Sequence, residues 1–289
     1  MIYIRFEIKI KSNVGWGLLP PTHKGIFNMK KLIILIAIIL ALTVVSTAIF
    51  FGVRTMKLNE YKNTEFNLPD GFTITAHTGC MGTAENSLES IKMGIENGAQ
   101  IIEFDLYFTK DGAPVLAHDE PKGGEVTLDE AFAYLRMFKD AKANVDIKTV
   151  DALEKVYPLA KENNVADRIF YTGVKDEFVD AVKKNSPEVK YYLNVDVEKS
   201  KNTDKDYLLS LVEKVKNAGA VGINFNYKSA SKELVDIFHE NGLLVSIWTV
   251  DSEYNMYKIL SFGPDNITTR NPDKLAKIIK VRRVEPNTP

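Results

Sequence analysis

Between residues 72 and 281, short β-rich runs alternate with amphipathic helical runs, and no other feature limits the possible folds as strongly. Strand–helix units in series build a parallel sheet covered by helices, and eight such units close into a barrel. An open, doubly wound sheet is the alternative, but no Gly-x-Gly-x-x-Gly follows the first strand. We therefore predict an α/β fold, a (β/α)8 TIM barrel, over residues 71–289. The expected strands are 72–77, 100–108, 144–148, 168–173, 190–196, 221–227, 243–250 and 266–269, with an extra strand at 112–119. The expected helices are 86–97, 127–138, 150–163, 175–184, 204–218, 231–241, 252–261 and 272–281.

An uncharged run of 22 residues, 32–53, lies outside this pattern. As a helix it is about 33 Å long, which is enough to cross the hydrocarbon core of a membrane. Lys30 and Lys31 precede the run, so we expect residues 1–31 to stay in the cytoplasm and the rest to be exported. The predicted order is a transmembrane anchor at 32–53, a polar linker at 54–70 and then the barrel. This order predicts a single-pass protein of the cell membrane with its barrel outside the cytoplasm.

A cleaved signal peptide is the alternative, because residues 46–48 are small enough for a cleavage site, and the protein would then be secreted. We favour the anchor because the apolar run continues beyond that site. Residues 29–31 have the form of a natural export-signal start. Residues 1–28 are therefore interpreted as an upstream extension of the gene.

The charge and cysteine content exclude several classes of protein. The formal net charge is −1 at pH 7, and without a basic stripe we predict no nucleic-acid partner. Cys80 is the only cysteine, which excludes an internal disulfide and a cysteine-based zinc cluster. We expect it to be a small filler residue.

Two neighbouring strands carry acidic side chains at the end where barrels place their functional residues. Glu103 and Asp105 are two apart and so face the same side, and Asp146 and Lys148 repeat the spacing on the next strand. Three carboxylates at one mouth repel one another unless a cation neutralises them. Oxygen ligands suit one divalent cation, Mg²⁺ or Ca²⁺. The alternative is internal pairing of the acids with Lys148 and Lys110.

Two of the four histidines, His77 and His118, follow strands at this same end. A pair of imidazoles beside a divalent ion suits acid–base or nucleophilic work on a phosphodiester. We expect His239, near the end of a helix, to be a solvated residue without a functional role.

Residues beside the presumed mouth have both structural and functional interpretations. Asn86 is predicted to cap the first helix, with Glu89 completing a capping box. Glu85 precedes it and faces the mouth, either favouring the positive helix end or supporting the site. Trp248 is either a packing residue or an apolar wall for substrate, and we favour the wall.

The stretch "ITAHTGCMGTAENSLESIKMGIENGAQIIEFDLYFTKDGAPVLAHDEP" resembles the glycerophosphodiester phosphodiesterase family. That family has a strand-end His-Arg-Gly, a Glu-Asn-Thr/Ser helix start, a Glu-x-Asp strand, a Thr-Lys-Asp-Gly turn and a His-Asp pair. "NVDIK", "VSIWTV" and "NITTRNP" resemble its later strands, so the resemblance covers about residues 72–280. It implies metal-dependent hydrolysis of glycerophosphodiesters to glycerol 3-phosphate and an alcohol. The implied residues are His77 and His118 for catalysis, Glu103, Asp105 and Asp146 for the metal, and Lys148 for the phosphate.

Three departures from the family pattern affect the binding of substrate. Thr78 stands where the family has an arginine, and Arg270 stands where it has an acid. Because the last strand of a closed barrel pairs with the first, Arg270 should lie near Thr78. We hypothesise that Arg270 reaches across the mouth to bind phosphate; the alternative is that it points outward to solvent. The connection after His118 is short, which suggests an open site that admits a bulky substrate.

The expected partner is a small-molecule or lipid-derived phosphodiester, and two other functions stay open. One is phospholipase D-like cleavage of lysophospholipids or sphingomyelin, because "NVDIK" has the Asp-x-Lys form of those related barrels. The anchor would hold such a site near lipid. The other is a non-catalytic surface protein that binds a phosphate headgroup, which Thr78 alone favours.

Overall fold

The computed structural model describes residues 23–284 of the chain. The described residues fall into two compact units that meet between residues 57 and 58 of the chain, and each unit is described by itself. In the first unit, helix α1 (His23–Asn63) begins, and the side chains of residues 32–53 are exposed. From Lys31 onward this helix is long and apolar enough to span a membrane, a property that an N-terminal signal sequence shares. Most of the predicted cytoplasmic segment, residues 1–31, lies outside the described residues.

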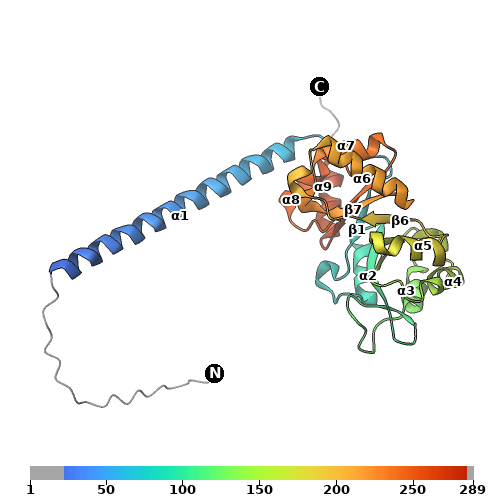
Figure 1. The fold of residues 1–289 in the computed structure, drawn as a ribbon. Helices are drawn as coiled ribbons and strands as arrows, with labels where there is room; N and C mark the ends of the chain where they lie inside the picture. The colour runs from blue at the N-terminus through green and yellow to red at the C-terminus, as the bar shows by residue number, and fades with distance from the viewer. Residues whose placement is uncertain (1–22, 285–289) are drawn as a thin grey trace, which may run out of the picture. The chain divides into compact units, whose positions relative to one another are not determined.

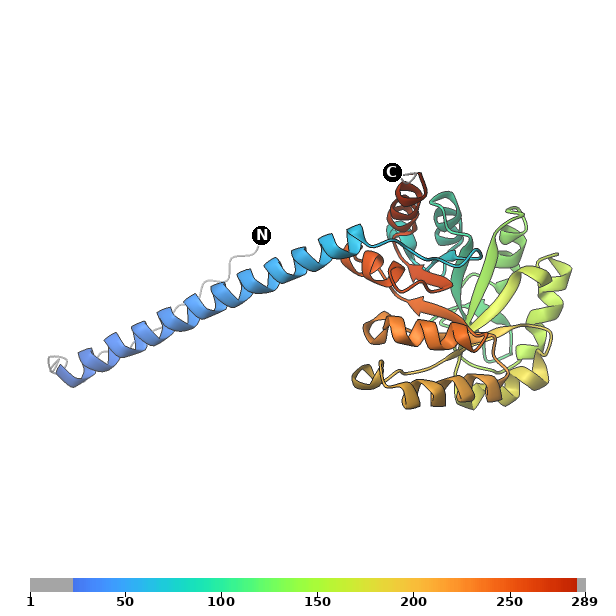
Figure 2. The same ribbon diagram turned by 90° about the horizontal axis from the view of Figure 1, so that it is seen from above.

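In the described part of the second unit, eight parallel strands form a closed barrel surrounded by helices (Figures 1 and 2). Strand β1 pairs with β2 on one side and with β9 on the other, which closes the sheet and excludes the open alternative. The barrel strands are β1 (Thr73–Ala76), β2 (Ile101–Phe108), β4 (Lys142–Ile147), β5 (Ile169–Val174), β6 (Tyr191–Asn194), β7 (Gly222–Asn226), β8 (Leu244–Trp248) and β9 (Asn266–Thr269). The predicted TIM barrel is confirmed.

Helices follow the barrel strands in the predicted order and near the expected bounds, except that the helix expected at 150–163 begins only at Val156. The α-helices are α2 (Leu88–Glu96), α3 (Leu128–Leu135), α4 (Val156–Glu162), α5 (Val179–Asn185), α6 (Lys205–Ala218), α7 (Lys232–Glu240), α8 (Glu253–Leu260) and α9 (Pro272–Val284). Short 3₁₀ turns lie at Cys80–Gly82, Leu153–Lys155, Ala166–Arg168, Asp176–Phe178, Lys199–Lys201 and Tyr227–Ser229.

Strand β3 (Pro114–Leu116) turns back along β2 and pairs with it in the antiparallel direction. Gly112, with φ of 75°, supplies the left-handed residue that the tight turn between them requires. The strand is shorter than the predicted 112–119. His118 therefore lies in the loop after β3 rather than on the strand itself.

The apolar core lies between the strands and the helices, whereas the barrel interior is polar. Strand β2 shows the division, because its side chains alternate between the two faces. The ring of Phe104 contacts that of Phe132 on α3 at 6.3 Å, so Glu103 and Asp105 on the opposite face point into the barrel. Deeper in the barrel, buried polar side chains bond to one another, as Asn266 does to Thr75 at 2.7 Å.

The predicted polar linker, residues 54–70, is helical as far as Asn63, and from residue 58 it belongs to the barrel unit. Within that unit, the ring of Tyr61 meets that of Tyr254 edge-on at 5.8 Å, and Lys62 pairs with Glu253 at 2.8 Å. Both partners lie in the first turn of α8. From residue 58 onward, this segment is therefore packed against α8.

Candidate active site

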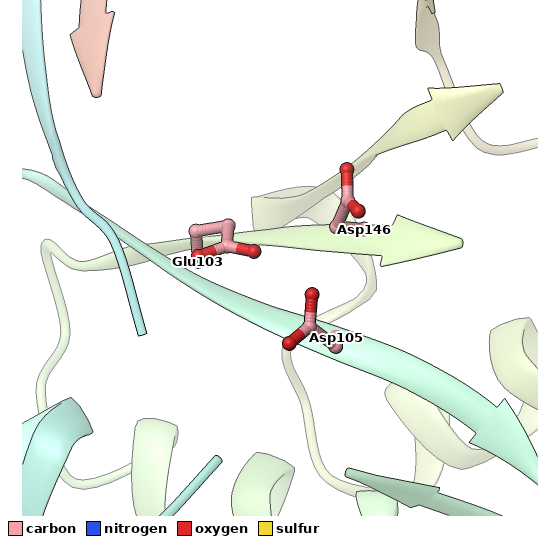
Figure 3. Close-up of side chains that lie close together, drawn as sticks. All are labelled: Glu103, Asp105 and Asp146. Carbon is pink, nitrogen blue, oxygen red and sulfur yellow. The ribbon is translucent and has the colours of Figure 1, made fainter. Parts of the chain in front are cut away.

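Three carboxylates converge at the mouth of the barrel. Glu103 and Asp105 come from β2 and Asp146 from β4, where Asp105 and Asp146 are direct register partners (Figure 3). One oxygen of each lies within 4.8 Å of the others, and Glu103 and Asp105 are at most 5% exposed. Buried carboxylates this close to one another are unfavourable without a compensating cation, and three such oxygens are the donor set of a hard divalent ion. The residues present therefore fit a metal of this kind.

Each of these acids is held on one side by a neutral donor from a different segment of the chain. Hydrogen bonds of this kind fix the direction of a carboxylate without neutralising it, so it stays available to a cation. The bonds are Thr78 N to Glu103 Oε2 at 2.8 Å, Asn86 Nδ2 to Asp105 Oδ2 at 2.9 Å, and Thr172 Oγ1 to Asp146 Oδ1 at 2.6 Å.

Lys148 lies between two of the acids, with its Nζ 2.7 Å from Asp105 and 2.6 Å from Asp146. Burial alone would lower the pKa of Lys148, but the two carboxylates outweigh it and the net shift is upward. Internal pairing with Lys148 is thus observed, whereas Lys110 pairs with Glu120 instead. One ammonium cannot neutralise three carboxylates, and burial together with the charges of Asp105 and Asp146 raises the pKa of Glu103 well above its ordinary value.

His77 follows β1, and its side chain is 21% exposed beside Glu103. Its Nδ1 lies 2.8 Å from the carbonyl oxygen of Thr78. Because a carbonyl oxygen only accepts hydrogen bonds, Nδ1 carries the proton in a neutral ring and Nε2 keeps a free lone pair. Burial lowers the pKa of His77, and the nearby charge of Arg270 lowers it further. The ring is therefore suited to accept a proton near neutral pH.

His118 lies at the rim of the site, close to the acidic strand. The preceding residue, Ala117, donates its backbone N–H to the carbonyl oxygen of Asp105 at 3.1 Å, which holds the loop against β2. The His118 side chain is 64% exposed, and its Nδ1 lies 3.1 Å from Asp119 Oδ1. This contact with Asp119 orients the imidazole at the rim.

The prediction that Asn86 caps the first helix is wrong. Ser87 caps α2 by accepting the backbone N–H of Ser90, while Asn86 sits one residue earlier with a left-handed φ of 55°. Asn86 instead holds Asp105 through two bonds: its Nδ2 donates to the carboxylate, and its Oδ1 accepts the backbone N–H at 2.9 Å. The local sequence pattern predicted a capping role for Asn86, because it gives no information on a partner as distant in the chain as Asp105.

Arg270 lies beside the end of β1, as expected for a closed barrel. The backbone N–H of His77 donates to Thr269 O, and that of Met81 donates to Arg270 O, both at 2.9 Å. The guanidinium is 40% exposed and pairs with Asp251 at 3.3 Å and with Glu85 at 3.7 Å. Arg270 and Glu85, both singled out from the sequence, therefore meet in one ion-pair cluster.

Trp248 ends β8 and is partly buried. Within the described residues, its indole Nε1 is buried without a hydrogen-bond partner. This position at a strand end is compatible with the predicted substrate wall.

Asn86 and Thr172 support the acids but were not identified as site residues from the sequence. The Glu-Asn pair before the first helix was a usable signal for Asn86. Thr172 had no such signal, because only the register of β4 and β5 places it opposite Asp146.

Comparison with known proteins agrees with this geometry. The profile of the Glycerophosphoryl diester phosphodiesterase family matches residues 75–140 and 135–274, more than half of the chain. A glycerophosphodiester phosphodiesterase from Caldanaerobacter subterraneus subsp. tengcongensis is 27% identical over 248 residues, which cover 72% of this chain and 97% of that protein.

Two solved structures show the same fold. A glycerophosphodiester phosphodiesterase from Parabacteroides distasonis has a TM-score of 0.60 at 20% identity, covering 74% of this chain and 99% of that one. An Oleispira antarctica phosphodiesterase, in complex with the product sn-glycerol-3-phosphate, has a TM-score of 0.60 at 19% identity and covers 74% and 97%. The chain belongs to the glycerophosphoryl diester phosphodiesterase family, a family of phosphoric diester hydrolases.

Proposed function

We propose that this protein hydrolyses glycerophosphodiesters to glycerol 3-phosphate and an alcohol, and that it needs one divalent cation to do so. The observation that carries the proposal is the cluster of three carboxylates within 4.8 Å, beside a histidine whose pKa is lowered. Relatives named glycerophosphodiester phosphodiesterase support the substrate class.

Glu103, Asp105 and Asp146 would hold the cation, which is Mg²⁺ or Ca²⁺. When bound, a divalent ion polarises a phosphoryl oxygen and neutralises the negative charge that develops on it. Lys148, whose ammonium already lies at two of the acids, adds a second positive charge for the phosphate. Its raised pKa keeps it charged over the whole working range of pH.

His77 and His118 divide the proton transfers between them. Nε2 of His77 takes the proton of the attacking hydroxyl, and the ring of His118, oriented by Asp119, gives a proton to the departing alcohol oxygen. If the glycerol hydroxyl next to the phosphate attacks first, the P–O bond to the alcohol breaks and a cyclic phosphate forms. Water then opens the ring to glycerol 3-phosphate, with the same two side chains in reversed roles.

Arg270 supplies the third positive charge of the mouth, oriented by Glu85 and Asp251. In this proposal its exposed guanidinium contacts a phosphate oxygen, a task that the buried Thr78 cannot perform. Trp248 forms an apolar wall against the glycerol or alcohol carbon atoms.

The apolar part of α1 anchors the protein as a single-pass protein of the cell membrane. In this proposal the barrel lies outside the cytoplasm, because Lys30 and Lys31 precede the span.

The test is product analysis with full-length protein in detergent. Phosphorus NMR of glycerophosphocholine incubated with the protein and Mg²⁺ or Ca²⁺ should show glycerol 3-phosphate, and a cyclic phosphate detected before it would support the two-step route. Turnover of lysophosphatidylcholine but not of glycerophosphocholine would replace the proposal with the phospholipase D-like activity. Headgroup binding without turnover of either substrate would indicate a non-catalytic surface protein.

A further inference from the structure

Thr78 bonds to His77, Glu103 and Asn86 of the candidate site, although its side chain is buried. The residue is 2% exposed. Its carbonyl oxygen accepts from His77, and its backbone N–H donates to Glu103 Oε2. Thr78 is too buried to bind a phosphate, and its bond to Glu103 indicates a role in holding the acids.

The hydroxyl of Thr78 holds the residue that orients a second acid. The backbone N–H of Asn86 donates to Thr78 Oγ1 at 2.5 Å, and the hydroxyl lies 3.4 Å from Asn86 Oδ1. Asn86 has a left-handed φ of 55°, which asparagine tolerates better than most residues, and the bond to Thr78 Oγ1 holds its backbone in place. From this fixed position its side-chain amide grips Asp105 at both the carboxylate and the backbone N–H.

The geometry points to Thr78 as a positioning residue for the metal site. Its backbone N–H bonds directly to Glu103, and its hydroxyl holds Asn86, which in turn bonds to Asp105. Thr78 therefore orients two carboxylates, each through a separate hydrogen bond. This inference rests on the proposed function in that these carboxylates bind the cation. Outer partners of this kind typically change metal affinity by about 10- to 100-fold when they are removed.

The two bonds can be separated by substitution. Thr78→Val keeps the volume and the N–H to Glu103 but leaves the Asn86 N–H without its acceptor. Thr78→Ser keeps both bonds. Thr83→Val is the matched control, because the Thr83 hydroxyl donates to Cys80 O at 2.8 Å in the same loop and touches none of the acids.

The experiment is calorimetric titration of the full-length protein in detergent, stripped with EDTA, with MgCl₂ or CaCl₂. We expect Thr78→Val to weaken binding by about 10- to 100-fold, while Thr78→Ser and Thr83→Val bind as the wild type does. Equal affinity of Thr78→Val and the wild type, or an equal loss in Thr83→Val, would overturn the inference.

Asn86→Gly provides a second test if Thr78→Val does not fold, because glycine accepts the left-handed φ and removes only the amide. It should weaken metal binding to a similar extent, and unchanged binding would also overturn the inference. A wild type that binds neither ion is a different result, because it removes the metal from the proposed function itself.

Discussion

Replacing Glu103 by glutamine should stabilise the metal-free protein near neutral pH. Its carboxylate oxygen lies within 4.8 Å of those of two other acids, so each repulsion amounts to at least about 3.5 kcal/mol at an effective dielectric constant near 20. The positive charge of Lys148 offsets part of this repulsion. Protonation of Glu103 sets an upper limit to the destabilisation, because the protonated residue is no longer repelled. Taking up the proton at pH 7 costs about 1.36 kcal/mol for each of the ~2.7 pH units above the ordinary pKa of glutamate, or about 3.7 kcal/mol.

The stabilisation should depend on pH in a defined direction. The pKa of Glu103 is raised in the folded state, so the folded protein keeps a proton that the unfolded chain has already released. The free energy of unfolding of the metal-free wild type therefore falls as pH rises above about 4.3, and it goes on falling until the folded pKa is passed. Glutamine does not titrate, yet its carbonyl oxygen can still accept the N–H of Thr78.

We expect Glu103→Gln to gain about 2–3 kcal/mol at pH 7 in EDTA, which is roughly 4–12 °C in Tm for a domain of this size. The assay is thermal unfolding in detergent at pH 5, 6, 7 and 8, with Glu240→Gln as an exposed control on α7. The difference from the wild type should grow with pH for Glu103→Gln and stay near zero for the control. A wild-type stability that does not change from pH 5 to 8, with no gain in Glu103→Gln, would refute the reasoning.

Three further predictions concern catalysis, substrate binding and the fold. His77→Ala and His118→Ala should each lower kcat by about 10²–10⁴-fold. In the wild type, kcat/KM should fall on acidification only below the ordinary imidazole pKa of ~6.5, because the pKa of His77 is lowered. Arg270→Ala should raise KM, and also the inhibition constant of inorganic phosphate, by an amount equivalent to about 1.5–3 kcal/mol; unchanged values of both would leave Lys148 and the cation as the phosphate contacts. Gly173→Ala should lower Tm, because a Cβ there would lie 2.4 Å from the carbonyl oxygen of Ile147; an unchanged Tm would mean that β4 and β5 can separate without cost.

The arrangement of the barrel and the convergence of its main polar residues could be predicted from the sequence. Parallel strands end at the same side of a sheet, so the spacing of Glu103, Asp105 and Asp146 was sufficient to bring them together. The strand pairing that closes the barrel likewise placed Arg270 beside the end of β1. These inferences depend only on strand periodicity and closure.

Other features depend on contacts between distant segments and could not be predicted in this way. Asparagine is a common helix-capping residue. Asn86 does not cap α2, because its backbone is left-handed and it bonds to Asp105 and Thr78 instead. The polarity of residues 54–70 indicated a linker, and no sequence signal showed that Tyr61 would pack against Tyr254 of α8. The absence of the family arginine at Thr78 indicated a change in substrate binding, and only the fold shows that the Thr78 hydroxyl is bonded to Asn86.

The most direct test of the central claim is the dependence of turnover on metal. Full-length protein stripped with EDTA should release no glycerol 3-phosphate from glycerophosphocholine, and activity should return as Mg²⁺ or Ca²⁺ is added, saturating with one ion bound per chain. The Asp105→Asn variant should stay folded and fail to recover at the same ion concentrations. Full wild-type turnover in excess EDTA, or recovery of Asp105→Asn identical to that of the wild type, would contradict the account.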